Sequence, residues 1–328
     1  MTIDWESLLS RAITYFFQAA FQAVFLAGTL LGLRYGLVPT HVSIKPSRRV
    51  LVRSSKNPSR RIKVHVFEPP SYETRKGALP THVNFHGCGF VLPVFGSDAE
   101  LCAYWASTLN CIVLDADYGK GPRYPHPTPV NDAMDVLRFV ISEPQTFDLT
   151  RLTIGGFSSG ANIAILASLR ASRVKIPIKS VVAWYPPTDL TRAGEEEMSS
   201  AIVNRIHKAF RRSYLPPYID RMDPEVSPLY ADASLFPPLT LIVSLLLIEL
   251  NTSLTFRIEV GEKDKLLLDA TDLADKLHNE GKNCVLHTVP GAGHVWERFL
   301  KEGTPLWEER KKALSLMENR LRAAYDVV

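Results

Sequence analysis

The residues best suited to chemistry are a serine and the two glycines around it, in the segment Gly156-Phe157-Ser158-Ser159-Gly160. An apolar run from Thr153 precedes the segment and a helical pattern follows it, so the serine lies between a strand and a helix. Glycines on both sides of Ser158 permit a sharp turn in which the hydroxyl group projects away from the backbone. Ser158 is therefore the candidate nucleophile for acyl transfer.

A nucleophilic serine needs a base that takes its proton and an acid that orients the base. His294 ends the glycine-rich loop Pro290 to His294, which follows a short strand, and Asp264 lies in a turn just after another strand. The order serine, acid, histidine is one of the known arrangements of such a triad. We predict that His294 is the base and that Asp264 is the acid.

Three other carboxylates lie close enough in sequence to compete with Asp264, namely Glu262, Asp269 and Glu297. Asp269 belongs to the following helix, and Glu297 comes after the base instead of before it. Asp264 therefore remains the preferred acid.

Donors for a developing oxyanion are expected from main-chain amides. One is the amide of Ser159, the residue after the nucleophile. Others come from the loop His86-Gly87-Cys88-Gly89, where glycines let the backbone approach a substrate oxygen. We predict an oxyanion hole built from Gly87, Cys88, Gly89 and Ser159. Cys88 is a weaker candidate for the nucleophile, because no basic partner is placed for it.

The elements around these residues alternate between strand and helix. Two strands at 49–53 and 62–67 come first. Strands at 81–85, 111–115, 153–157, 180–185, 239–243 and 284–288 then alternate with helices at 97–109, 129–141, 159–170, 267–280 and 305–324. This alternation predicts an α/β fold with a mostly parallel sheet and helices on both faces. The irregular stretch 188–236 is expected to be a cap insertion over the edge of the sheet.

With these motifs in order, the chain resembles the hormone-sensitive-lipase group of the α/β-hydrolase family, which includes arylacetamide deacetylases and microbial esterases. The likeness covers about residues 80 to 325 and rests on HGCGF, Tyr118 to Pro122, GFSSG, Ser227 to Leu229, GEKDKL and GAGH. It implies hydrolysis of a carboxylic ester with a modest acyl group, a helical cap, and no cofactor or metal. Phe157 stands where the family has aspartate, and Cys88 where it has glycine.

Two other functions remain open on the same fold. An amidase or formamidase would use the same triad with a different pocket. A non-catalytic small-molecule receptor would lack the base, and the presence of His294 argues against it. The preferred prediction is a serine carboxylesterase or deacetylase that acts on a small hydrophobic ester.

The N-terminal part, residues 1–36, contains an apolar stretch of 22 residues, Ala12 to Leu33, without a charge. Such a stretch is long enough to cross a bilayer as a helix, so we predict a single-pass membrane anchor, with the endoplasmic reticulum as a candidate location. An amphipathic helix that covers an active site, and a cleaved signal peptide, are the alternatives. Gln18 and Gln22 lower the hydropathy of the stretch and keep the first of these alternatives open.

Charge is unevenly distributed along the chain. Residues 34–76 hold 11 Lys and Arg against two acidic residues, while the whole chain has a net charge of +4. A basic segment after an apolar one suits an anionic membrane surface on the cytosolic side, or is simply a solvated face. No nucleic-acid-binding motif accompanies it, so no nucleic-acid partner is expected. The four cysteines lack metal-site spacing, and the sequence leaves the oligomeric state open.

We place the hydrolase domain at 37–328. One segment within it does not fit the alternation of strands and helices around it. Residues 243–257 add about 15 residues to the connection before Asp264, which is long beside a catalytic turn. Without them, the sequence around Pro238 joins Ile258 as one continuous strand. We hypothesise that the segment is a translated intron, and a full-length transcript that retains it would contradict this hypothesis.

Overall fold

The computed structural model describes residues 4–35, 44–192, 201–245, 265–298 and 300–326. It also leaves out the side chains of 21–35 and of a few further residues beside the gaps. An eight-stranded sheet in the order β1-β2-β4-β3-β5-β6-β7-β8 forms its centre. The first two pairings, β1 with β2 and β2 with β4, are antiparallel, and all others are parallel. The α/β-hydrolase fold predicted from the sequence is therefore confirmed.

The strands lie close to their predicted positions. They are β1 (Arg48–Arg53), β2 (Arg61–Phe67), β3 (Leu79–Phe85), β4 (Ile112–Ala116), β5 (Phe147–Phe157), β6 (Ser180–Trp184), β7 (Leu239–Leu245) and β8 (Cys284–Pro290). The central strands β4 and β6 are buried along their whole length, because helices cover both faces of the sheet. Their near-continuous apolar sequences reflect this burial.

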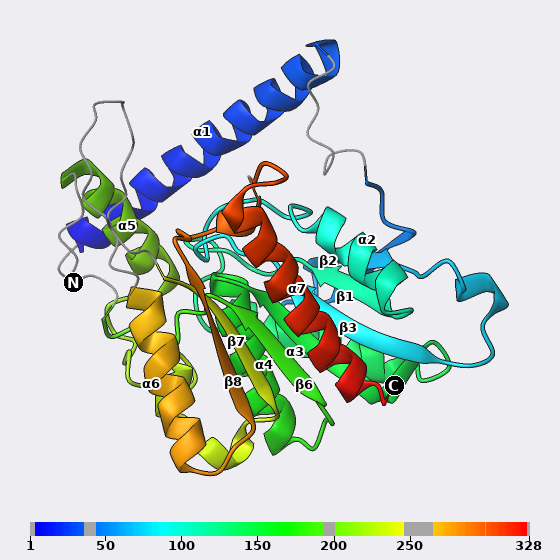
Figure 1. Ribbon diagram of the computed structural model, residues 1–328. Coiled ribbons are helices and arrows are strands. Elements are labelled where there is room, and N and C mark those ends of the chain that lie inside the picture. Colours follow the sequence, from blue (N-terminus) through cyan, green and yellow to red (C-terminus); the bar gives the residue numbers. More distant parts are fainter. Residues whose placement is uncertain (1–3, 36–43, 193–200, 246–264, 299, 327–328) are drawn as a thin grey trace.

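Helices pack on the two faces of the sheet in separate hydrophobic clusters (Figure 1). One cluster contains α3 (Thr128–Ser142), α4 (Ser159–Arg173) and α6 (Lys265–Asn279), and the other contains α2 (Ala99–Thr108) and α7 (Pro305–Ala324). The start of α7 is fixed locally, because the Thr304 side chain accepts a hydrogen bond from the Trp307 amide and Pro305 occupies the first turn. Because the strands from β3 to β8 are parallel, their carboxyl ends lie at the same edge of the sheet.

The stretch 188–236 contains a helix that the sequence analysis did not predict, α5 (Ala201–Tyr214). Short 3-10 turns at Pro228–Tyr230 and Ala233–Leu235 follow it. Its four basic residues and the prolines just after it obscure the helical pattern. The helix is stabilised by tertiary contacts, since Ala209 and Tyr214 are buried.

The long N-terminal helix α1 (Trp5–Tyr35) lies beside α5 and reaches away from the sheet towards its C-terminal end (Figure 1). The prediction of a membrane anchor, and with it the membrane location and membrane partner, is wrong. Within the described part of the chain, no helix is long and apolar enough to cross a membrane. Thr14 is fully buried and shares a hydrogen bond of 2.8 Å with Ser213 of α5, so the N-terminal part of this helix packs on protein.

The suspected segment 243–257 lies mostly outside the described residues. Its first three residues, 243–245, extend β7 and pair with Thr288 to Pro290 of β8. They occupy the positions that residues 258–260 would take if the segment were removed. The intron hypothesis therefore stays a hypothesis.

Candidate active site

Ser158 lies in the sharp turn between β5 and α4 that the glycines around it predict. Its φ of 49° and ψ of −120° place it in a region that residues with a side chain rarely adopt. The Ser158 amide donates to the Trp184 carbonyl at 2.9 Å, and the Ser158 carbonyl accepts the first hydrogen bond of α4. These two bonds hold the strained turn at the carboxyl end of the sheet.

The two flanking glycines are required by close backbone contacts. A Cβ atom at Gly160 would lie 2.0 Å from the Phe85 carbonyl oxygen, and one at Gly156 would lie 2.4 Å from the same atom. The end of β3 therefore packs directly against the first turn of α4. No larger residue fits there without a shift of the backbone.

His294 meets the serine, as the sequence order predicts. Its Nε2 atom lies 3.1 Å from Ser158 Oγ, within hydrogen-bond distance. The loop that carries it ends in Val295, with a φ of 61°, and continues into the short 3-10 turn Trp296–Arg298. The ring of Tyr185, at the end of β6, meets the His294 ring edge to face at 4.7 Å between centroids. This aromatic contact fixes one side of the imidazole.

The candidate acid, Asp264, lies outside the described residues, as does its rival Glu262. The two other rivals have other partners. Asp269 approaches Arg192 at 3.4 Å, and burial together with the charge of Asp189 raises its pKa to about 7. Glu297 is buried and accepts a hydrogen bond of 2.7 Å from the Tyr185 hydroxyl. Neither contact is to the imidazole of His294.

A buried ion pair supports the loop of His294 from below. The Arg298 guanidinium donates to the Asp98 carboxylate at 2.6 Å, and its centre lies 5.4 Å from the Phe157 ring centroid. Burial is the largest single effect on Asp98 and would raise its pKa, but the charge of Arg298 and the hydrogen bonds from Asn84 and Arg298 contribute to a net lowering of the pKa. The ion pair therefore joins the turn after His294 to the start of α2, and the contact with Phe157 joins the same turn to β5, the strand before the nucleophile.

The predicted oxyanion loop lies directly over the serine. A Cβ atom at Gly87 would lie 3.0 Å from the Phe157 carbonyl oxygen and 3.3 Å from Ser158 Cβ. Gly89 has a φ of 57° and Phe90 a φ of 63°, so two successive residues adopt the left-handed conformation. The first turn of α4 leaves the Ser159 amide without a partner inside the helix. The loop and this helix end can thus present amides to the same oxygen.

The structure shows one feature of this loop that the sequence did not indicate. The Cys88 amide donates to Ser159 Oγ at 2.9 Å, so its assignment to the oxyanion hole requires that this bond be shared or opened. The Tyr118 hydroxyl completes the cluster, donating to the His86 carbonyl at 2.7 Å and lying 3.1 Å from Ser159 Oγ. Burial raises the pKa of the Cys88 thiol, which keeps it neutral and disfavours it as a nucleophile.

His86 has a structural position beside the loop. Its ring is buried and stacks on Tyr118, with 4.9 Å between centroids, and its Nε2 lies 3.4 Å from Asp117. Burial, followed by the charge of Lys120, lowers the pKa of His86. A neutral imidazole is therefore expected, and it orients the loop instead of reacting.

Two residues near the site were missed or misread from the sequence. Tyr185 carried a weak signal, because an aromatic residue at the carboxyl end of a central strand faces the edge where a site forms. Gln18 is a polar residue within an apolar run. In the structure its side-chain amide donates to the carbonyls of Val91 and Gly121, beside the oxyanion loop. A polar residue in an apolar helix is thus a signal for a specific contact.

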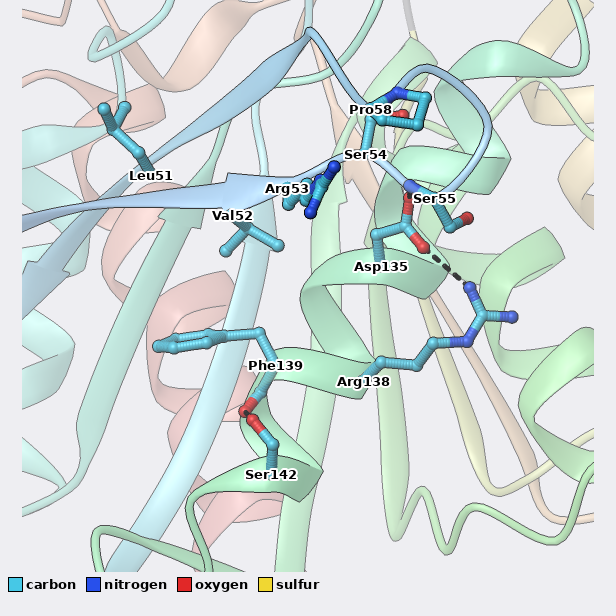
Figure 2. Close-up of a pocket in the computed structure, with 10 residues that line it drawn as sticks. All are labelled: Leu51, Val52, Arg53, Ser54, Ser55, Pro58, Asp135, Arg138, Phe139 and Ser142. Atoms are coloured by element: carbon cyan, nitrogen blue, oxygen red, sulfur yellow. Dashed lines mark hydrogen bonds and ion pairs between the residues drawn. The ribbon is translucent and has the colours of Figure 1, made fainter.

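A separate surface pocket lies away from the serine, between the edge strand β1 and α3 (Figure 2). Its volume is about 590 Å³. Asp135 occupies its wall and accepts hydrogen bonds from the Arg138 guanidinium at 2.7 Å and from the Ser55 amide at 2.8 Å. None of its lining residues is a candidate catalytic residue, so the pocket has no part in the site.

The chain is similar to known esterases in part of its length. A stretch of 148 residues is 30% identical to an esterase, LipI, of Mycobacterium tuberculosis, and it covers 44% of this chain and 46% of the relative. A stretch of 245 residues is 26% identical to an ethyl acetate hydrolase of Pseudomonas putida, and it covers 72% of this chain and 71% of that one. The chain spans about half the length of the first curated relatives that it matches.

The fold has close counterparts among solved structures. A hyperthermophilic esterase from the archaeon Pyrobaculum calidifontis superposes with a TM-score of 0.69 at 21% identity, covering 98% of both chains. A sequence profile of the α/β hydrolase fold matches residues 82–298, which is more than half of the chain. The resemblance predicted from the motifs is confirmed, and the chain belongs to the α/β-hydrolase family.

Proposed function

We propose that the protein is a serine esterase that cleaves carboxylic esters through an acyl-enzyme. The observation that carries this proposal is the hydrogen-bond distance of 3.1 Å between Ser158 Oγ and His294 Nε2, on a strained turn below an amide-rich loop. A nucleophile, a base within reach of it, and donors for an oxyanion are the parts that acyl transfer requires.

The reaction follows from the roles of these residues. Ser158 Oγ attacks the ester carbonyl while His294 Nε2 takes the hydroxyl proton. The amides of Gly89 and Ser159 stabilise the oxyanion, joined by that of Cys88 when its bond to Ser159 opens. His294 returns the proton to the leaving alcohol, and a water molecule then cleaves the acyl-enzyme by the same steps. Asp264 is assigned the role of orienting His294, from the sequence order alone.

The substrate class is proposed from the wall of the site and from the relatives. The cap, formed by α1, α5 and the other described residues of 188–236, packs Tyr214 on Phe90 beside the oxyanion loop, at 3.7 Å between centroids. Such a wall favours a small hydrophobic ester. The name of the Pseudomonas relative, an ethyl acetate hydrolase, supports a short acyl group.

The test is the hydrolysis of p-nitrophenyl acetate by the wild type and by Ser158→Ala. We expect the variant to lose activity by a factor of about 10⁴ or more while its circular dichroism spectrum is unchanged. Labelling with a fluorophosphonate, present in the wild type and absent in the variant, identifies the nucleophile. Matched p-nitrophenyl ester and p-nitroanilide substrates distinguish an esterase from an amidase. Retained activity in Ser158→Ala would refute the proposal.

A further inference from the structure

The side chain of Gln18 connects α1 to the oxyanion loop. Its Nε2 atom donates to the Val91 carbonyl at 2.6 Å and to the Gly121 carbonyl at 2.8 Å. Both partners are acceptors, so only the NH₂ end of the side-chain amide can face them, and both of its hydrogens are used. The orientation of this side chain is therefore fixed by chemistry.

Gln18 contacts two loops where they join each other. The Gly121 amide donates to the Phe90 carbonyl at 3.0 Å, and the Val91 amide donates to the Cys88 carbonyl at 3.2 Å. Gln18 thus closes a ring of hydrogen bonds through the oxyanion loop and the loop at 118–122. Val91 lies two residues beyond Gly89, whose amide is a candidate oxyanion donor.

The loop needs a partner outside itself to keep its shape. Gly89 and Phe90 both have a positive φ, and the Phe90 conformation costs energy because it has a side chain. Oxyanion donors stabilise a transition state only if they are held in place before the charge develops. A displacement of about 1 Å in such a group can cost a factor of 100 in rate.

We propose that Gln18 is a positioning residue for the oxyanion hole, acting through the Val91 and Gly121 carbonyls. The inference rests on the proposed esterase function, since the hole has a role only in that reaction. It also assigns a function to α1, which is to hold the catalytic loop through Gln18.

Thr14 provides a matched control on the same helix. Its hydroxyl lies 2.8 Å from Ser213 Oγ of α5, one turn away from Gln18, and is fully buried. It therefore joins α1 to α5 through Ser213, whereas Gln18 bonds to the carbonyls of Val91 and Gly121. If the Gln18 variants lost activity only because α1 no longer docks, Thr14→Val should lose kcat to the same extent.

The experiment compares Gln18→Met, which keeps the length but has no donor, with Gln18→Ala and Thr14→Val in the full chain. We expect kcat for p-nitrophenyl acetate to fall about tenfold to 100-fold in both Gln18 variants, with KM changed less than about twofold. Inhibition by an alkyl trifluoromethyl ketone, whose adduct with Ser158 carries an oxyanion, should weaken by the same factor as kcat/KM. Thr14→Val should keep kcat within about twofold.

Hydrogen–deuterium exchange gives a readout that does not depend on activity. The peptide spanning residues 86–92 should exchange faster in Gln18→Met than in the wild type or in Thr14→Val. An unchanged kcat and unchanged exchange in Gln18→Met, or equal losses in Thr14→Val, would overturn the inference. Activity retained by Ser158→Ala would instead refute the esterase proposal, and the exchange measurement would still decide whether Gln18 holds the loop.

Discussion

The turn around Ser158 and the cap above it hold the site by different means. At the turn, backbone atoms are in direct contact, since a Cβ atom at Gly160 would lie 2.0 Å from the Phe85 carbonyl oxygen. At the cap, α1 and α5 are joined to each other and to the loops by a few side chains, such as Thr14, Gln18 and Tyr214. Substitutions at the turn should therefore destabilise the fold, whereas loss of the Gln18 contact in the cap should affect mainly the rate.

The largest effect is expected from Gly160→Ala. The new methyl group would meet the carbonyl groups of Phe85 and His86, which belong to the backbone and cannot rotate away. We expect the free energy of unfolding to fall by at least about 3 kcal/mol, measured by urea denaturation. Gly293→Ala is the control, because a Cβ there meets nothing within 4 Å. Equal stability of the two variants would show that the turn is less tightly packed than its geometry implies.

A slightly smaller effect is expected when the ion pair below the histidine loop loses one partner. Arg298→Met leaves the fully buried Asp98 carboxylate without its cation, at a cost of about 3 kcal/mol. The double variant with Asp98→Asn should recover part of this loss, since it removes the buried charge. Denaturation of the two single variants and the double variant measures the coupling, and additive losses would argue against a direct pair.

Asp269, which contacts the cap at Arg192, should make stability depend on pH. Burial, and then the charge of Asp189, raises its pKa to about 7, above its ordinary value of 3.8. The folded state then binds a proton that the unfolded state has lost, so stability is full below about pH 4 and declines as pH rises to 7.

Asp269→Asn removes this titration while it keeps the size of the side chain. We expect its thermal midpoint to fall less than that of the wild type between pH 4 and pH 8. The relative gain at pH 8 should be on the order of 1–3 kcal/mol. Parallel curves for the two proteins would mean that Arg192 compensates the charge fully.

The smallest effect is expected at the N-terminal end of the cap. Glu6 forms an ion pair with Arg212 of α5, but its side chain is 69% exposed. Glu6→Gln should change the free energy of unfolding by about 0.5 kcal/mol or less, because water and salt screen such pairs. If Glu6→Gln lowered the free energy of unfolding by several kcal/mol, the cap would be as sensitive to substitution as the turn around Ser158.

Most of the fold was predictable from local patterns. The strand segments before Ser158 and before the oxyanion loop are each followed or ended by glycine, and these signals lie within a few residues of each other. The helix α5 was not predictable in the same way. It is held by contacts with residues far away in the chain, such as Tyr214 with Phe90 and Ser213 with Thr14.

The residues of the site also differ in how far the sequence predicted them. Ser158 and His294 were identified from their turns and their order, and the structure brings them to 3.1 Å. The bond from the Cys88 amide to Ser159 Oγ had no sequence signal, because it joins residues 71 positions apart. Asp264 was chosen from order alone and remains a prediction, since it lies outside the described residues.

The sequence by itself determined the turn chemistry, because glycine, serine and strand periodicity act over a few neighbouring residues. Only the tertiary structure decided what the apolar helix α1 does. Hydropathy measures how apolar a stretch is, but not whether lipid or protein covers it. The partners of Gln18 and Thr14 lie 73 to 199 positions away in the chain, and they became neighbours only when the sheet and cap assembled.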